Sequence, residues 1–250
     1  MIQSLERGIL ILEILESQKA CGVTEIAKKL DINKSSAFRL LQTLEAKNLV
    51  EKDEQNKYKL GTRFLQFANH VLEGMELTKI AKPYLDELVR LTQETAHLCI
   101  LSNGKALFID QKRSSEIVSV NTRTGGQEPL HCSAVGKVLL AFLKPDKLEE
   151  MLDSIEFTQY TPRTITSRPV LIAQLEKIRE LGYAVDDEEI NVGVRCIAAP
   201  IRDYTDSVIA SIGVSGPASR VQFDSIDEYA NSVKLVADKI SIKMGHVKAK

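Results

Sequence analysis

Apolar residues recur at helical spacing in three segments near the start of the chain. Residues 4–17 carry leucine and isoleucine on two sides of the predicted helix. A helix that is apolar on two sides is often buried between two bodies, so this segment indicates either a dimer contact or a central core helix. A second, shorter amphipathic helix is predicted around Val23, Ile26, Ala27 and Leu30.

A third amphipathic helix follows the break Asp31-Ile32-Asn33, and Asn33 is a favourable N-cap for it. Apolar residues at helical spacing form one face of this helix. The opposite face is polar and consists of Lys34, Ser35, Ser36, Arg39, Gln42 and Thr43. Such a face belongs either to a DNA-reading helix or to the surface of an interaction module.

A hairpin is predicted next, because Val50 precedes a polar turn and Tyr58 and Leu60 alternate with Lys57 and Lys59. Helix, tight turn, helix and basic hairpin together are typical of a winged helix-turn-helix, in which the second helix enters the major groove. Residues 62–73 predict a connecting helix.

From residue 77 onward, strands and helices alternate irregularly, which predicts an α+β fold with a largely antiparallel sheet. Asn103-Gly104 between two apolar runs is a strong hairpin signal. The predicted strands are 117–121, 195–201 and 208–214. The predicted helices are 77–92, 133–142, a short one from 145, 170–181 and 226–244.

The side chains on the third helix suit contacts with double-stranded DNA. Ser35 and Ser36 lie at its start, where hydroxyl and backbone N–H groups can hold phosphate. Arg39 can reach guanine with two hydrogen bonds, and Gln42 and Thr43 follow one turn later. Lysines of the hairpin, at positions 52, 57 and 59, can contact the flanking backbone.

Composition adds little to this picture. The net charge is −1, and residues 1–63 hold two more basic than acidic residues. The four cysteines form no C-x-x-C pair, which favours reduced thiols and a cytoplasmic location. No apolar run is long enough for a membrane span, and no secretory signal is expected.

Six segments resemble the IclR family of bacterial transcriptional regulators. They are MIQSLERGILILEIL, VTEIAKKLDINKSSAFRLLQTLEAKNLVEK, YKLGTRFLQFA, PLHCSAVGKVLLAFL, RELGYAVDDEEINVGVRCIAAPI and SIGVSGPASRV. The resemblance implies a winged helix-turn-helix domain at 1–61, a connector helix at 62–76 and an effector-binding domain similar to GAF and PAS modules at 77–250. It also implies a homodimer or dimer of dimers that binds a DNA operator, with a repressor favoured.

The resemblance further implies an effector site in the C-terminal domain. Ile117 and Val120 would supply an apolar wall, and the backbone at Ala134 and Val135 would face the ligand. Asp186, Cys196 and Ser215 match side-chain positions, while Gly213 stands where some relatives carry serine.

Physical reasoning favours a small anionic metabolite at this site, such as a sugar acid or a 2-oxo acid. A helix that begins at Ser133 offers free N–H groups to a carboxylate. Asp186 would repel an anion unless donors balance it or it points elsewhere. Ser133 is otherwise a plain N-cap, and Cys196 is otherwise a small core residue.

The sequence matches known catalytic motifs poorly. Gly136-Lys137 lacks the other residues of a phosphate-binding loop, and the segment around Ser215 is not a nucleophile elbow. The candidate metal ligands His97, His131, Cys132 and Cys196 lack zinc-site spacing. We therefore expect no catalytic residue, metal or cofactor. The alternative is a small-molecule-binding enzyme, or a thiol or metal sensor, whose N-terminal helices only dimerise.

Overall fold

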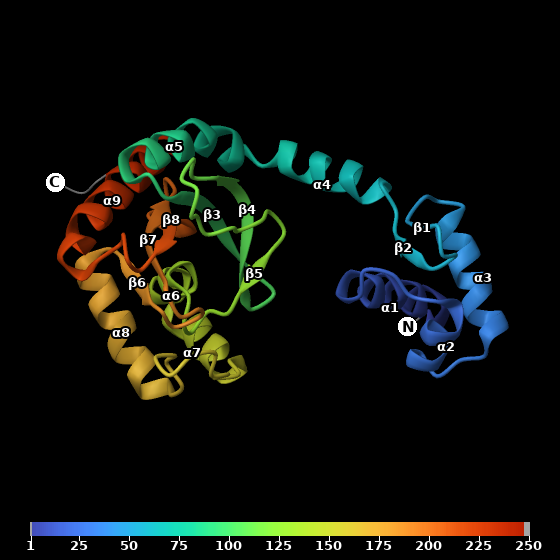
Figure 1. Ribbon diagram of the computed structural model, residues 1–250. Helices are drawn as coiled ribbons and strands as arrows, with labels where there is room; N and C mark the ends of the chain where they lie inside the picture. The colour runs from blue at the N-terminus through green and yellow to red at the C-terminus, as the bar shows by residue number, and fades with distance from the viewer. Residues whose placement is uncertain (1, 248–250) are drawn as a thin grey trace. The chain divides into compact units, whose positions relative to one another are not determined.

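The computed structural model describes residues 2–247, apart from the side chains of residues 69, 72 and 73. The chain divides into two compact units, Met1–Gly74 and Met75–Lys250 (Figure 1). The first unit contains α1 (Gln3–Ser17), α2 (Val23–Lys29), α3 (Lys34–Glu45), β1 (Val50–Lys52), β2 (Tyr58–Leu60) and α4 (Arg63–Gly74). This order confirms the predicted winged helix-turn-helix.

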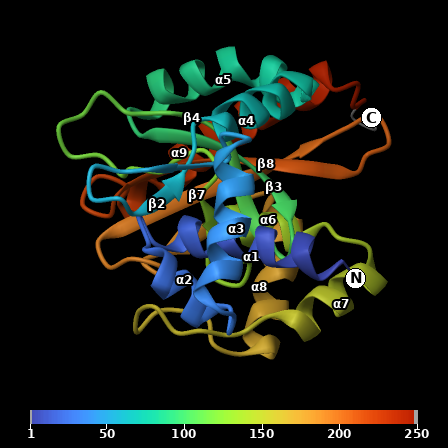
Figure 2. The same cartoon turned by 90° about the vertical axis from the view of Figure 1, so that its right-hand side faces the viewer.

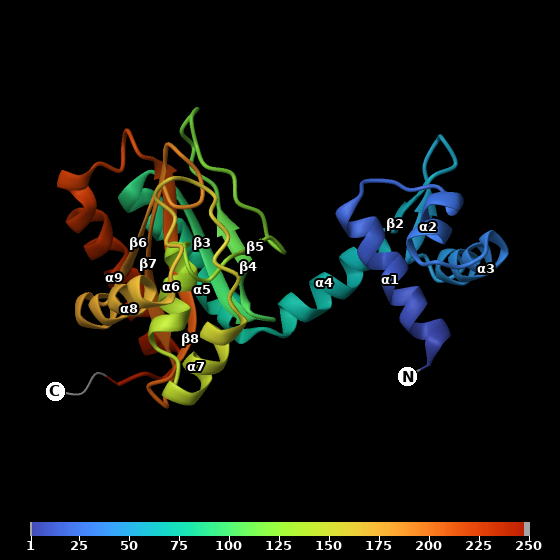
Figure 3. The same cartoon turned by 90° about the horizontal axis from the view of Figure 1, so that it is seen from below.

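The small core of the first unit positions α3. Ile11 of α1, Ile26 of α2 and Leu41 of α3 are fully buried in one apolar cluster. Helix α1 packs against α3 and β2 (Figure 3). Tyr58 of β2 exchanges two backbone hydrogen bonds of 2.9 Å with Cys21. These bonds connect the β1–β2 hairpin, which we call the wing, to the segment before α2.

The N-terminus of α3 is capped as predicted. Asn33 Oδ1 accepts a hydrogen bond of 2.7 Å from the Ser36 N–H. Asp31 has a φ of 50° in the tight turn before it, a left-handed conformation that short polar side chains tolerate. The turn and the cap together set the direction in which α3 leaves α2.

The second unit is built around one six-stranded sheet. Its helices are α5 (Glu76–Thr92), α6 (Ala134–Ala141), α7 (Pro145–Ser154), α8 (Arg168–Leu181) and α9 (Ile226–Lys243). Its strands are β3 (Thr95–Ser102), β4 (Lys105–Lys112), β5 (Gln127–Glu128), β6 (Ala184–Asp187), β7 (Val194–Arg202) and β8 (Val208–Pro217). The strand order is β5-β4-β3-β8-β7-β6 and every pair is antiparallel, so the predicted α+β class with an antiparallel sheet is confirmed.

Helices cover both faces of this sheet. Helices α5 and α9 pack together on one face, and α6 lies on the other with α8 packed against it (Figure 2). Alternate strand residues, including Cys99, Phe108 and Cys196, share a buried cluster with α6 and α8. We call this side of the sheet the α6 face, because the effector-site residues must be located relative to it.

The predicted strand at 117–121 is wrong. Residues 113–126 form a loop, and the Ile117 side chain is fully exposed. The edge of β4 pairs instead with β5, through Ala106 with Glu128 and Leu107 with Gln127. Arg220 donates a hydrogen bond of 2.8 Å to the Val118 carbonyl, so a side chain partners the loop where a neighbouring strand was expected.

Across residues 2–247, each helix is too short or too polar to cross a bilayer.

Candidate DNA interface and candidate effector site

Helix α3 presents one polar face to solvent. Ala37 and Leu41 are buried against the first unit's core. The exposed residues on the other side are Lys34, Ser35, Phe38, Arg39, Gln42 and Thr43, while Ser36 is half-buried. The six predicted residues of this helix therefore occupy one continuous surface with Phe38 among them.

The cationic side chains of this surface are available to a ligand. Within residues 2–247, neither Lys34 nor Arg39 makes an ion pair. The Thr43 hydroxyl donates to the Arg39 carbonyl at 3.0 Å, so it is already engaged within the helix. The N–H of Ser35 has no partner in the described structure, and such groups at a helix start favour phosphate.

Phe38 is a residue that the sequence reasoning missed. Its side chain is 42% exposed, and it lies one turn from Ser35 and from Gln42 on the same surface. Apolar side chains on a groove-reading helix contact the methyl group of thymine. The available signal was a large aromatic residue between polar ones, off the apolar spacing of the helix.

The wing lysines differ in whether they form ion pairs. Lys59 pairs with Glu51 at 3.1 Å, and Lys52 pairs with Glu45 at 3.6 Å. Lys57 is exposed and forms no ion pair within the described part of the chain. Asp53 Oδ1 holds the turn by accepting the Lys57 N–H at 2.9 Å. Lys57 is thus the wing residue best prepared to contact an anionic backbone.

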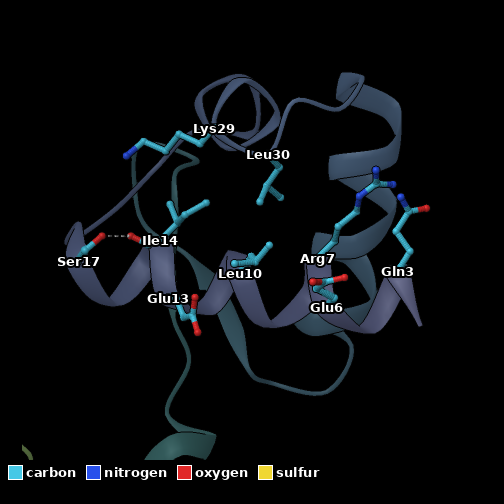
Figure 4. Close-up of a pocket in the computed structure, with 9 residues that line it drawn as sticks. All are labelled: Gln3, Glu6, Arg7, Leu10, Glu13, Ile14, Ser17, Lys29 and Leu30. Carbon is cyan, nitrogen blue, oxygen red and sulfur yellow. Dashed lines mark hydrogen bonds between the residues drawn. The ribbon is translucent and has the colours of Figure 1, made fainter. Parts of the chain in front are cut away.

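A groove of about 510 Å³ runs along α1 beside the end of α2. Figure 4 shows Leu10, Ile14 and Leu30 along its middle, with Arg7 and Glu13 among the charged side chains at its margin. An open groove with mixed charges suits a protein surface better than a small metabolite.

In the second unit, the first backbone N–H groups of α6 lack hydrogen-bond partners within the described structure. Ser133 Oγ accepts the Gly136 N–H at 3.0 Å and donates to the Pro129 carbonyl at 2.7 Å. The N–H groups of Ala134 and Val135 have no partner among the residues described. A Cβ at Gly136 would lie 2.6 Å from Leu130 Cα, so glycine allows this close approach.

Three of the predicted side chains form a row across neighbouring strands. The strand register pairs Asp186 of β6 with Cys196 of β7, and Cys196 with Ser215 of β8. All three are buried, and the Ser215 hydroxyl donates to Cys196 Sγ at 3.1 Å. We call Asp186, Cys196 and Ser215 the polar row.

Gly213 leaves room for a histidine that the effector-site prediction omitted. His97 of β3 lies opposite Gly213 in the strand register. Its Nε2 is 2.8 Å from Ser215 Oγ. A Cβ at Gly213 would lie 3.0 Å from His97 Cε1 and 2.6 Å from the Ile197 carbonyl oxygen. The imidazole therefore occupies the space into which a serine at position 213 would extend.

A buried ion pair lies beside the polar row. Lys137 of α6 is completely buried and pairs with Glu189, which follows β6. Lys137 Nζ also donates to the Val185 carbonyl at 2.7 Å. Asp186 Oδ1 accepts the Glu189 N–H at 2.7 Å. Asp186 thus has a hydrogen-bond donor and a nearby cation, although burial outweighs both in setting its pKa.

Burial shifts the protonation of the groups on the α6 face. It raises the pKa of Asp186 to about 7. Burial, together with the Asp186 carboxyl, raises the pKa of Glu128 to about 7. Burial lowers the pKa of His97 to about 4, so this imidazole is neutral at physiological pH. Both carboxyl groups are therefore partly protonated near neutrality and repel an anion less than ordinary carboxylates would.

Two predicted residues lie in the loop outside the sheet. Ile117 points into solvent, and Val120 is half-buried. The structure brings Ser133, Ala134, Val135, Gly213 and the polar row to the α6 face, and it leaves Ile117 away from any buried surface. An apolar wall from 117–120 would need the loop to close, because this segment is not a strand.

The described structure does not favour a metal or thiol sensor. No group of three or more potential metal ligands is present among residues 2–247. Burial raises the pKa of the Cys99, Cys132 and Cys196 thiols, which disfavours the thiolate that a redox sensor needs. His131 Nε2 lies 3.1 Å from the Thr158 carbonyl, a contact that uses this nitrogen as a donor.

Comparisons with known proteins agree on both units. Residues 4–54 match the family model of the IclR helix-turn-helix domain. Residues 69–242 match the model described as bacterial transcriptional regulator IclR C-terminal. Among curated proteins, the chain is 36% identical over 245 residues to the HTH-type transcriptional repressor AllR of Salmonella typhi, which covers 97% of this chain and 90% of that protein.

Solved structures resemble the whole chain. The IclR of Thermotoga maritima superimposes with a TM-score of 0.79 at 32% identity, covering 98% of this chain and all of that one. An IclR homologue from Microbacterium hydrocarbonoxydans, complexed with 4-hydroxybenzoate, gives a TM-score of 0.83 over 96% of this chain and 98% of that one. At its 24% identity, the second likeness shows the fold alone.

Proposed function

The chain belongs to the IclR family of bacterial transcriptional regulators, and on that premise we propose that it is a repressor relieved by a small carboxylate metabolite. DNA is bound by the first unit and the metabolite by the α6 face of the second unit. The free N–H groups of Ala134 and Val135 beside the buried polar row carry this proposal, since an anion satisfies both at once.

The DNA interface consists of the exposed face of α3 and the wing. Arg39 and Gln42 read bases in the major groove, and Phe38 contacts a thymine methyl group. Lys34, Ser35 and Ser36 hold phosphate at the helix start, with Thr43 at the margin of the surface. Lys57 and Lys59 contact the neighbouring backbone, Lys57 directly and Lys59 after release from Glu51.

The effector is a small anionic metabolite with a carboxylate and further oxygen atoms. Its carboxylate binds at the start of α6, and its remaining oxygens face Asp186, Cys196 and Ser215. A family member of the same fold is known in complex with 4-hydroxybenzoate, itself a small carboxylate. Loop 113–126, including Ile117 and Val120, closes over the bound acid as the apolar wall.

A homodimer, or a dimer of dimers, is the binding form. Helix α1 exposes Leu5 at 61% and Ile9 at 49%, and α4 exposes Leu65 at 72% and Val71 at 58%. Apolar rows of this kind on a polar surface mark protein interfaces. A dimer places two α3 helices on two half-sites of a cytoplasmic operator.

Relief of repression follows from different affinities for two arrangements of the dimer. A ligand shifts such an equilibrium only by its differential affinity for the two states. Helix α4, the connector helix, lies between the winged helix-turn-helix and α5 in the chain and is the element we assign to transmit the change.

The test combines effector screening with a gel shift. A panel of sugar acids and 2-oxo acids is screened for an increase in thermal midpoint, since a ligand of the folded state raises it. The stabilising acid is then added to the protein bound to DNA upstream of its own gene, and release of that DNA is expected.

The variant Ser215→Ala provides the matching site test. It removes the hydroxyl that contacts Cys196 Sγ and His97 Nε2 in the proposed site, so the acid concentration needed to release DNA should rise about tenfold. An unchanged dose response in this variant would remove the α6 face as the effector site. A protein that shows no specific shift on any operator fragment would remove the regulator function.

A further inference from the structure

Among the described residues of the second unit, two buried side-chain atoms lack a hydrogen-bond partner, Glu189 Oε2 and His97 Nδ1. The His97 side chain is 2% exposed, and its Nδ1 has no hydrogen-bond partner in the described structure. Leaving a buried polar atom unpaired is unfavourable, and nearly all such atoms in folded proteins find a partner. A ligand that binds on this face can supply the missing hydrogen bond.

We assign the tautomer of His97 from the hydrogen-bonding roles of its neighbours. A serine hydroxyl has a single hydrogen, and Ser215 donates it to Cys196 Sγ. The 2.8 Å contact between Ser215 Oγ and His97 Nε2 therefore needs the hydrogen on Nε2. A neutral imidazole then has a lone pair on Nδ1. Nδ1 is therefore a hydrogen-bond acceptor, and its partner must be a hydrogen-bond donor.

The imidazole is held rigidly in this orientation. Phe108 meets the ring edge to face, with centroids 5.2 Å apart. Ser215 holds Nε2, and Gly213 leaves the space beside Cε1. A group fixed on both sides, with one lone pair free, discriminates between ligands by what they offer at that point.

We propose that His97 is a specificity-determining residue of the effector site, whose Nδ1 accepts a hydrogen bond from a hydroxyl group of the bound acid. The site then takes a hydroxy acid in preference to the corresponding oxo acid, because a carbonyl oxygen offers no hydrogen to Nδ1. This role of His97 rests on the proposed effector site and narrows its ligand class. The ring and the closer Ile197 carbonyl oxygen both favour glycine at position 213.

The experiment uses three pairs of acids that differ only at one carbon. Glycolate is compared with glyoxylate, lactate with pyruvate, and gluconate with 2-oxogluconate, by calorimetric titration of the full-length protein. The wild type should bind the hydroxy member of a pair about three- to tenfold more tightly, the range for one neutral hydrogen bond.

Two variants separate the nitrogens of the ring. His97→Gln keeps a polar atom near Nε2 and loses the group at Nδ1, so the preference for hydroxy acids should fall to about one. His97→Asn keeps a polar atom near Nδ1, so it should retain part of the preference. A purely structural role would weaken both members of each pair equally in both variants.

A measurement on the wild type guards against variants that fail to fold. The ¹⁵N resonance of His97 Nδ1, assigned by replacing the other three histidines in turn, should move when the hydroxy acid is added and stay in place with the oxo acid. Tight binding without preference, or an unmoved Nδ1 resonance at saturation, would overturn the role of His97 alone. A wild type that binds none of the six acids would overturn the proposed effector class together with it.

Discussion

Arg39 and Phe38 are neighbours in sequence and share one exposed surface of α3. The arginine is free of ion pairs within the described residues, so its guanidinium can point at a base edge without first breaking a contact. Arginine presents two parallel donors to the acceptors of guanine, and this contact specifies sequence in a way that phosphate contacts cannot. Under the proposed function, base reading depends on single side chains at defined positions.

Replacing Arg39 by alanine tests the proposed contact between this side chain and a base. The loss of a bidentate base contact should weaken operator binding by about 1–3 kcal/mol, measured by fluorescence anisotropy at fixed salt. Arg113→Ala is the matched control, because it removes an exposed arginine from the loop after β4 in the second unit. Equal affinities for Arg39→Ala and wild type would take Arg39 out of the set of base readers.

The carboxyl groups of Asp186 and Glu128 make unfolding sensitive to pH. Both have a folded-state pKa of about 7, whereas unfolded carboxyl groups release their protons near pH 4. Between these values the native state binds more protons than the unfolded state. The contribution of these groups to stability is therefore complete below about pH 4 and is lost as the pH rises through about 7.

The variant Asp186→Asn should make the unfolding free energy less dependent on pH. The amide oxygen can still accept the Glu189 N–H, and it carries no charge at any pH. We expect the unfolding free energy of the variant, relative to wild type, to rise from pH 5 to about pH 7 and to level off above it in urea titrations. A difference that stays constant over this range would show that Asp186 titrates like a solvent-exposed carboxyl.

At the scale of elements, the Lys137–Glu189 pair fixes α6 to the segment after β6. Both partners are buried, and the pair determines how the first turn of α6 meets the polar row. Removing one partner of a buried ion pair leaves an uncompensated charge, while replacing both by apolar residues is often neutral. The two elements are thus coupled through charge as well as through packing.

A mutant cycle separates these effects. Lys137→Met should destabilise the second unit by about 3–5 kcal/mol, because Glu189 loses its cation. The double variant Lys137→Met with Glu189→Leu should recover most of that loss. Urea unfolding of the wild type, both single variants and the double variant gives the coupling free energy. Additive losses would mean that the two residues do not act as a pair.

Element predictions succeeded where a local signal was sufficient. Asn103-Gly104 adopts positive φ at both residues and joins β3 to β4, as the dipeptide predicts. Gly182 ends α8 with a φ of 75°. The strand predicted at 117–121 was wrong. Its apolar residues suit a strand, but a strand forms only where the edge of a neighbouring strand is free to pair with it. That edge belongs to β5, which has two residues and no sequence signal of its own.

At the scale of the whole molecule, the apolar residues of α1 divide into a buried set and an exposed set. Ile11 and Leu15 are buried in the first unit's core, whereas Leu5 and Ile9 are exposed. One side of the helix is therefore a core face, and the other side is available to a second copy. The buried side of α1 is therefore part of the core, and a dimer contact on its exposed side is our proposal.

Ile9→Glu should disrupt this contact without disturbing the core. We expect sedimentation velocity to show a smaller species, and operator affinity to fall because two half-sites are no longer bound together. Glu13→Lys, a charge change along the same helix at the margin of the groove in Figure 4, is the comparison for surface charge alone. An Ile9→Glu protein of unchanged mass in solution would move the dimer contact away from α1.

The sequence by itself determined the helices, their caps and the winged helix-turn-helix, because each depends on residues close together in the chain, and six separate motifs in order identified the family. Asn33 caps α3 from three residues away, and helical spacing identifies the buried side of α3 without any knowledge of its neighbours. Tertiary structure alone decided that His97 lies opposite Gly213, that Lys137 meets Glu189, and that 117–121 has no strand partner. These relations join residues distant in sequence, and they arise only when the sheet register and the packing of α6 bring the side chains together.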